Sequence, residues 1–237
     1  ASAAPPRGAG AVARSQAAAP ARRGAKGRGW LQRYYEQLER DEAQEADWKA
    51  RPALPPAAQG AAPRPRAFLD FERDSQPIGR VTVELAADLL PKTVDNFLRL
   101  CNGTTAPVQG IQNVEIGYKG NNVHQIFKDR FISMGDIFHG DGTGGHSALG
   151  TRNFEDEGFF VSHTKPGILS MANGGADQNN SVFFVTLKPL PHLNGRNVAF
   201  GAVVEGMEVL QKINKEFIVK GKPITPIKIR DCGVLES

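Results

Sequence analysis

The sequence is poor in cysteine and contains no long uninterrupted apolar run. Among its 237 residues are only two cysteines, Cys101 and Cys232. This is too few for a disulfide scaffold, so we expect a reducing compartment. No apolar run approaches the ~18 residues that a membrane-spanning helix needs, so we expect no membrane span. A hydrophobic content of 40% is ordinary for a chain that buries a core in water.

Signatures of common catalytic and cofactor sites are also missing. The histidines form no pair four residues apart and no cluster with the cysteines, so no zinc site is predicted. No Gly-x-Ser-x-Gly nucleophile motif occurs. Gly140, Gly142 and Gly145 fit a Gly-x-Gly-x-x-Gly pattern, but the residues after them are not helix formers, as a dinucleotide site requires. We predict a tightly turning surface loop there, and no cofactor.

Acidic residues are absent from residues 1–29, a basic segment rich in Ala, Gly and Pro. Such a segment cannot bury enough apolar surface to fold alone. It is either a flexible tail or an arm that binds RNA phosphate or an acidic protein surface, with Arg22 and Arg23 among its anchors. The composition is also typical of an organelle transit peptide. A mitochondrion or plastid is therefore the favoured localisation, and cytoplasm or nucleus is the alternative.

Residues 30–51 change to helix formers and predict an amphipathic, charged helix. Trp30, Tyr34 and Tyr35 recur at helical spacing near its start, and acidic residues dominate its second half. The aromatic stripe packs either on its own domain or on another subunit, since exposed Trp and Tyr often anchor interfaces. Residues 52–66 then predict a semi-rigid proline-rich linker, and residues 67–237 the folded domain.

From residue 67 onward, short apolar stretches predict many strands and two helices. One helix is expected to begin at Pro91 and to end before Gly103, and the other spans residues 207–213. The expected strands are residues 68–72, 80–85, 123–127, 131–134, 167–172, 181–187, 199–204 and 226–235. Because there is no regular βαβ alternation, the pattern favours a mainly β fold, a closed antiparallel barrel.

Several motifs of this region follow one another in the order of a known family. They include PKTVDNFLRLC (91–101), HTKPGILSMANGG (163–175), SVFF (181–184) and NGRNVAFGAVVEGM (194–207). In these motifs residues 67–236 resemble the cyclophilins, the cyclosporin-binding peptidyl-prolyl cis-trans isomerases. The resemblance implies an eight-stranded antiparallel barrel capped by two helices, with a shallow groove that holds an X-Pro dipeptide.

The residue expected to carry catalysis differs from the family pattern. Rotation about the imide bond crosses a barrier of about 18–20 kcal/mol. In the family, an arginine directly after a histidine places a cationic donor at the imide nitrogen. Here the histidine is His124, and the neutral amide Gln125 follows it. By analogy with loss of an oxyanion-type donor, this substitution would cost about 3 to 4 kcal/mol, or roughly a hundred- to thousandfold in rate.

The resemblance also assigns the remaining groove residues. The family's polar groove positions are changed: Met134 or a deletion and Val182 stand for glutamines, His192 for a tryptophan, and Asn197 for a histidine. Kept are the apolar floor and the edge for the extended peptide, which consist of Phe131, Ile132, Phe184, Leu193, Ala172, Asn173 and Gly174. The groove is therefore predicted to keep its shape and to lose its polar machinery.

Two functional hypotheses follow. The first is a cyclophilin-fold subunit with a degenerate site, which docks in a large organellar assembly and is held to protein subunits or RNA through its N-terminal segments. The second is an active peptidyl-prolyl isomerase or folding chaperone with a divergent site. Ordinary surface drift at Gln125, and plain core roles for Phe131 and Phe184, are the simpler interpretations of these residues.

Overall fold

The computed structural model describes residues 52–235 and six earlier positions, which are Glu36, Arg40, Ala43, Ala46, Asp47 and Ala50. These six are helical and exposed, and the Arg40 side chain approaches Glu36 one turn earlier. The basic arm and the proposed anchors Arg22, Arg23, Trp30, Tyr34 and Tyr35 lie outside the described residues. Within the described part of the chain, no helix has the length and apolar character needed to cross a membrane.

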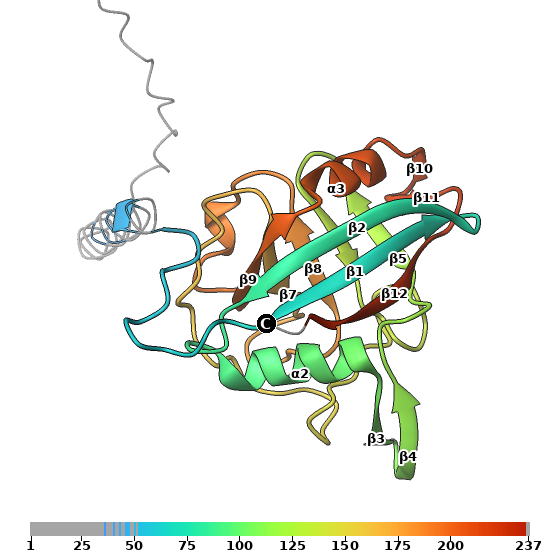
Figure 1. Ribbon diagram of the computed structural model, residues 1–237, viewed down its shortest axis with the longest axis horizontal. Helices are drawn as coiled ribbons and strands as arrows, with labels where there is room; N and C mark the ends of the chain where they lie inside the picture. The colour runs from blue at the N-terminus through green and yellow to red at the C-terminus, as the bar shows by residue number, and fades with distance from the viewer. Residues whose placement is uncertain are drawn as a thin grey trace, which may run out of the picture. The chain divides into compact units, whose positions relative to one another are not determined.

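An eight-stranded sheet forms the body of the domain (Figure 1). Its strand order is β12-β1-β2-β9-β7-β8-β6-β5, and all neighbouring strands are antiparallel. The strands are β1 Arg66–Arg73, β2 Gln76–Leu85, β5 Val123–Phe127, β6 Phe131–Met134, β7 Ile168–Met171, β8 Phe183–Thr186, β9 Ala199–Glu205 and β12 Ile227–Leu235. A bridge between Asn122 and Lys228 joins the two end strands and nearly closes the barrel. The predicted mainly β barrel is thereby confirmed.

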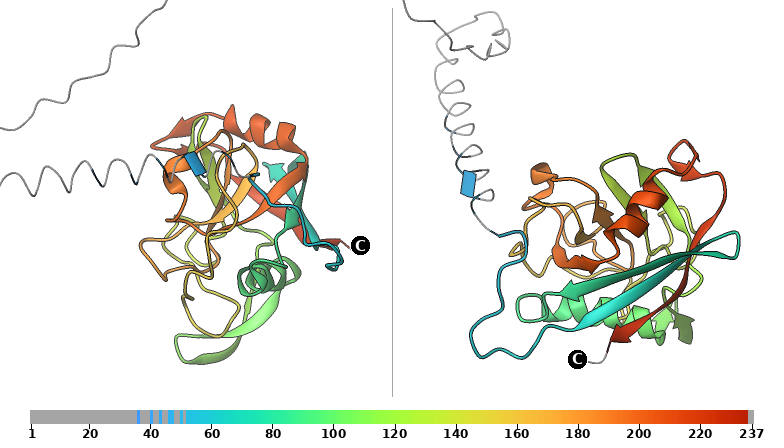
Figure 2. Two further views of the ribbon diagram at one scale, coloured as in Figure 1. Left: turned by 90° about the vertical axis from the view of Figure 1, so that its left-hand side faces the viewer. Right: turned by 45° about the horizontal axis from the view of Figure 1, so that its top comes forward.

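Two α-helices, α2 (Pro91–Asn102) and α3 (Met207–Asn214), lie at opposite ends of the barrel in Figures 1 and 2. Proline in the first turn of α2 and Gly103 just past its end, at φ 74°, set its limits as predicted. Its buried face carries Phe97, whose ring centroid lies 5.2 Å from those of Phe183 and Phe200. The helix thus closes one end of the core.

Two hairpins were not predicted. The first pairs β3 (Thr104–Val108) with β4 (Ile111–Ile116), and the second pairs β10 (Ile218–Val219) with β11 (Lys222–Pro223). The β10–β11 turn has positive φ at both Lys220 and Gly221, as a type I′ turn requires. Because each strand of this hairpin has only two residues, its sequence shows no alternation of apolar and polar residues that would predict a strand.

The proline-rich segment before β1 packs on the barrel. Ala53 is 3% exposed and belongs to the hydrophobic core, and its carbonyl oxygen accepts a hydrogen bond from the Ser162 amide (2.8 Å). The Arg64 guanidinium donates to both carboxylate oxygens of Asp88 (2.6 and 2.8 Å), which lowers the pKa of Asp88. The packed part of the domain therefore includes residues that the sequence assigned to a linker.

Candidate functional site

The register of β6, β8 and β7 decides which side chains face outward. Ser133 of β6 and Ser170 of β7 both pair with Phe184 of β8, and directly paired residues point to the same face of a sheet. The adjacent pair, Met134 and Phe183, is fully buried in the core. Ser133, Phe184 and Ser170 therefore lie on the opposite, outer face of the barrel wall.

Three phenylalanines cluster on this side, and we call Phe127, Phe131 and Phe184 the aromatic row. Phe184 is buried (4% exposed), and the other two reach the surface. The ring centroid of Phe131 lies 4.9 Å from that of Phe184 and 4.4 Å from that of Phe127. Phe127 is exposed and Phe131 is half-buried. The ring of His163 stacks on Phe184, with centroids 6.1 Å apart. The row offers the kind of apolar surface that can hold a proline ring.

Two residues predicted to line the groove belong to the core instead. Ile132 and Met134 have no exposed surface, because alternate residues of β6 point inward while Phe131 and Ser133 point outward. This corrects the expected placement of Ile132 and Met134. Ser133, which sequence reasoning missed, holds the outward position between them. The period of two along β6 was the signal that could have found it.

His124 is bound to Ser133 on the outer side of the wall. Its Nε2 lies 3.1 Å from Ser133 Oγ, and its Nδ1 is buried without a hydrogen-bond partner. Burial lowers the pKa of His124, so the neutral imidazole is favoured. His124 therefore brings no positive charge to the aromatic row at neutral pH.

Gln125 is turned toward the β10–β11 hairpin. Its Nε2 donates a hydrogen bond to the backbone oxygen of Lys220 (3.4 Å). Gly221 packs against it so closely that a Cβ there would lie 1.7 Å from this nitrogen. The backbone also joins here, since the Ile126 amide donates to the Gly221 oxygen (2.7 Å). The amide that follows His124 is thus held against the hairpin through one of its two N–H groups, and it carries no charge.

A cationic residue, Arg130, adjoins the aromatic row in the turn between β5 and β6 and not at the position of Gln125. Arg130 ends the turn between β5 and β6, directly before Phe131, and its Nη2 lies 3.5 Å from Nε2 of His192. His192 belongs to the 3-10 helix η1 (Pro191–Leu193), and both side chains are exposed. No sequence motif singled out Arg130, because only the fold of the turn and η1 brings the two residues together.

The remaining residues of η1 and the strand edge have structural partners. Leu193 is half-buried at the end of η1. Asn197 donates through Nδ2 to the Met171 oxygen (3.0 Å) and to Asn173 Oδ1 (3.3 Å). Asn197 thereby fixes the edge that the sequence assigned to an extended peptide.

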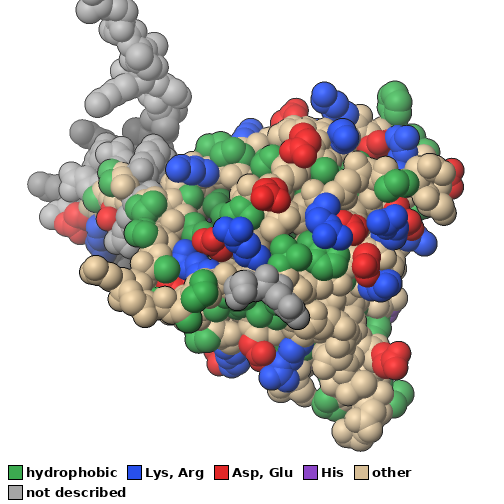
Figure 3. All heavy atoms as spheres, viewed as in Figure 1, with side chains coloured by type: hydrophobic (Ala, Val, Ile, Leu, Met, Phe, Trp, Pro, Cys, Tyr) green, Lys and Arg blue, Asp and Glu red, His purple; other side chains and the backbone are tan. Residues whose placement is uncertain are grey.

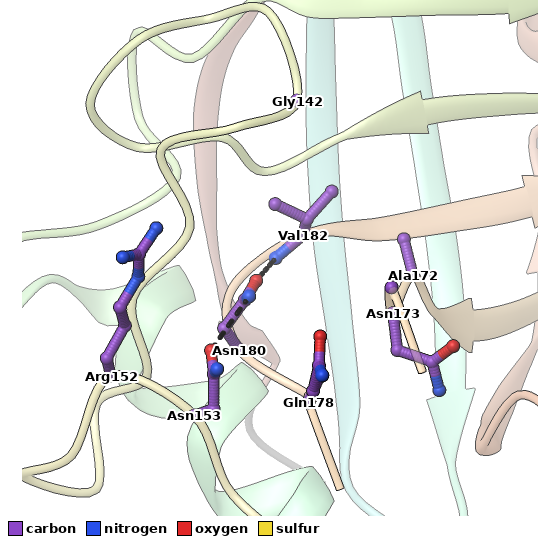
Figure 4. Close-up of a pocket in the computed structure, with 9 residues that line it drawn as sticks. Gly142, Arg152, Asn153, Ala172, Asn173, Gln178, Asn180 and Val182 are labelled. Carbon is purple, nitrogen blue, oxygen red and sulfur yellow. Dashed lines mark hydrogen bonds between the residues drawn. The ribbon is translucent and has the colours of Figure 1, made fainter. Parts of the chain in front are cut away.

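A pocket of about 560 Å³ adjoins this edge (Figure 4). Asn180 lies at its centre, where Oδ1 accepts from the Val182 amide (2.9 Å) and Nδ2 donates to Asn153 Oδ1 (3.2 Å). The pocket brings four predicted groove residues together with five that were not predicted; the lining is Ala172, Asn173, Gly174, Val182, Gly142, Arg152, Asn153, Gln178 and Asn180. Its polar lining suits a peptide backbone or a polar side chain.

One carboxylate organises the loop that borders this pocket. Asp136 is buried and accepts hydrogen bonds of 2.7–3.1 Å from five backbone amides, those of Phe138, His139, Asp141, Gly142 and Gly144. Burial alone would raise the pKa of Asp136, but these amides outweigh it and hold the pKa far below its usual range. Among the described residues, no three His, Cys, Asp or Glu side chains gather as a metal site would require.

Comparison with known proteins identifies the family of this barrel domain. Residues 68–234 match the family described as "Cyclophilin type peptidyl-prolyl cis-trans isomerase/CLD", and the chain belongs to this family. Similar proteins include "Peptidyl-prolyl cis-trans isomerase D" of Kluyveromyces lactis, 42% identical over 175 residues (73% of this chain, 47% of the relative). Another is "Peptidyl-prolyl cis-trans isomerase 9" of Caenorhabditis briggsae, 44% identical over 171 residues (72% and 54%). The chain spans about half the length of these two relatives.

Proposed function

We propose that the barrel binds X-Pro segments of proteins on its outer face and isomerises them only weakly. The observation that carries this proposal is the state of Gln125, a neutral amide that donates one of its two N–H groups to the Lys220 oxygen. Twisting of the imide is helped by a positive charge at its nitrogen, and neither Gln125 nor neutral His124 supplies one. Arg130 lies in the turn after β5, five residues from Gln125, so it does not stand at the position of a donor on β5. The aromatic row supports retention of proline binding.

Isomerase activity measured on a proline peptide tests this proposal. We expect turnover about a hundred- to thousandfold below that of an ordinary cyclophilin. Gln125→Arg is expected to raise turnover at least tenfold, whereas the control Gln125→Leu, which adds no charge, leaves it low. Turnover of the unchanged protein within about tenfold of an ordinary cyclophilin would instead favour the second hypothesis, an active isomerase or chaperone with a divergent site.

A second role, docking in a larger assembly, is favoured by the β10–β11 hairpin. Phe217, Val219 and Ile224 are 83%, 61% and 63% exposed, and we call them the hairpin patch. Figure 3 shows hydrophobic side chains beside Lys and Arg side chains at the upper right, where β10 and β11 lie in Figure 1. The flanking lysines are Lys215, Lys220 and Lys222, all exposed, and the acid of this segment, Glu216, is paired with Arg73 (2.6 Å).

The partner that suits this patch is a protein subunit whose apolar surface is bordered by acidic residues. The arm over residues 1–29 would add contacts to RNA or to acidic protein, and its Arg-rich, acid-free composition supports an organellar setting. In this proposal the domain acts as a pseudoenzyme that docks on its neighbours while it holds an X-Pro segment.

Sedimentation of the protein in native cell extract tests the docking role. We expect the unchanged protein in heavy fractions and Phe217→Asp/Val219→Asp in light ones. Ile111→Asp is the matched control, because Ile111 is 66% exposed on the other hairpin. Co-sedimentation of the double variant with heavy material, or a light unchanged protein, would overturn the docking role.

A further inference from the structure

A positive charge and an apolar surface meet at one end of the aromatic row. Arg130 directly precedes Phe131, and its Nη2 lies 3.5 Å from His192 Nε2. For this contact the imidazole nitrogen must accept, so only one part of the guanidinium is used. Arginine carries five N–H donors in a planar fork, and the unused donors remain available to a ligand.

No acidic residue of the described chain neutralises this arginine. Among residues 52–235, no carboxylate lies within ion-pair distance of Arg130. The neighbouring Asp129 accepts a hydrogen bond from Asn214 Nδ2 (2.7 Å). Lys128, also in the turn, donates to the backbone oxygens of Asn214 and Glu216. Arg130 is thus the cation of this turn with the most donors left for a ligand.

The segment from β8 into β9, which contributes Phe184 to the row, contains no acidic residue before Glu205. No Asp or Glu occurs between Asp177 and Glu205, a stretch that contains β8, η1 and most of β9. The cations of this stretch, Lys188 and Arg196, are exposed. This stretch therefore brings no carboxylate against a ligand on the aromatic row, and the acid of the β5–β6 turn, Asp129, is hydrogen-bonded to Asn214.

We propose that Arg130, held by His192, is a specificity-determining residue that selects X-Pro segments carrying a carboxylate side chain within two residues of the proline. This inference rests on the proposed function, because the proline ring occupies the aromatic row while the acid reaches Arg130. A carboxylate can accept two parallel N–H bonds from a guanidinium, a geometry that a lysine cannot offer.

Binding of labelled peptides, followed by fluorescence anisotropy, tests the inference. Each peptide contains one Ala-Pro bond, with Glu, Gln or Lys placed either directly after the proline or two residues before it. We expect the Glu peptide to bind about five- to tenfold more tightly than the matching Gln peptide in low salt. This preference is expected at one of the two positions, the one from which the side chain reaches Arg130. The preference is expected to shrink to about twofold in 0.5 M salt, because exposed charges are screened.

Variants show whether Arg130 causes the preference. Arg130→Gln is expected to bind the Glu and Gln peptides equally, and Arg130→Glu to favour the Lys peptide. Arg99→Gln is the matched control: it makes the same charge change at an exposed residue of α2 that is paired with Asp95, and it should keep the preference. Circular dichroism confirms that each exposed substitution leaves the fold intact.

Two different failures can be told apart. Equal binding of the Glu and Gln peptides at both positions, or a preference that survives in Arg130→Gln, overturns the subsite alone. If none of the peptides, including the Gln ones, binds at millimolar concentration, the proposed X-Pro binding fails and the subsite fails with it.

Discussion

At the scale of single residues, His163 stacks on Phe184 of the aromatic row and is fixed in place by hydrogen bonds. Its Nδ1 and its backbone amide both face Oδ1 of Asn194 (3.0 and 2.8 Å), and its Nε2 lies 2.9 Å from Ser170 Oγ. Since Asn194 Oδ1 accepts, Nδ1 carries the proton and the Ser170 hydroxyl donates to Nε2. The imidazole is thereby held as a neutral platform under Phe184.

This arrangement predicts a loss of stability in acid. Burial lowers the pKa of His163 to about 4, whereas an unfolded histidine titrates near 6.5. Between these values the unfolded state binds the additional proton, so stability is complete above pH 6.5 and falls as the pH drops toward 4, by about 3 kcal/mol. Urea denaturation from pH 4.5 to 7.5 measures this, and His163→Gln should flatten the slope.

His139, an exposed histidine of the loop that follows β6, provides the control for this prediction. His139→Gln is expected to keep the full pH slope. An unchanged slope in His163→Gln would show that other groups carry the acid sensitivity.

At the scale of elements, the loop after β6 depends on the Asp136 carboxylate. Asp136→Asn keeps one acceptor oxygen and loses the other, so at least two of the five backbone amides lose their partner. We expect a loss of about 2–3 kcal/mol, measured as a lower free energy of unfolding. Asp141→Asn is the control, because the Asp141 carboxylate accepts only from the nearby Thr143 and is expected to change stability little. Equal losses in the two variants would contradict the role given to Asp136.

The same scale shows what could be predicted from the sequence. Strands β5 and β6 have the bounds expected from apolar spacing, and α2 begins at its proline as predicted. The β3–β4 hairpin was missed because Pro107 and the positive φ of Gln109 interrupt the strand signal. Within the site, Phe131 and Phe184 of the aromatic row were named from the sequence, whereas Phe127 was not. The inward direction of Ile132 and the approach of Arg130 to His192 depend on register and turn conformation, which the sequence pattern did not specify.

At the scale of the whole domain, the segment before β1 is part of the stable unit. A chain that begins at residue 67 loses the part-buried Arg64–Asp88 pair and the core contact of Ala53. We expect it to be about 2–4 kcal/mol less stable than a chain that begins at residue 52. Chemical denaturation measures the difference, and Arg64→Ala in the longer chain should reproduce most of it. Identical midpoints for the two chains would show that the segment only lies on the surface.

The two end strands of the sheet, β5 and β12, are joined by fewer hydrogen bonds than the other neighbouring strands. β8 has a neighbouring strand on each side, whereas β5 pairs within the sheet with β6 alone. Its other edge is held by single contacts, which are the Asn122–Lys228 bridge to β12 and the Ile126 amide bound to the Gly221 oxygen of the β10–β11 hairpin (2.7 Å). We expect backbone amides of β5 to exchange with solvent sooner than those of β8, because fewer ladder hydrogen bonds hold β5. Hydrogen exchange of the two strands would show whether the wall segment that carries His124 and Gln125 opens while the rest of the domain stays folded.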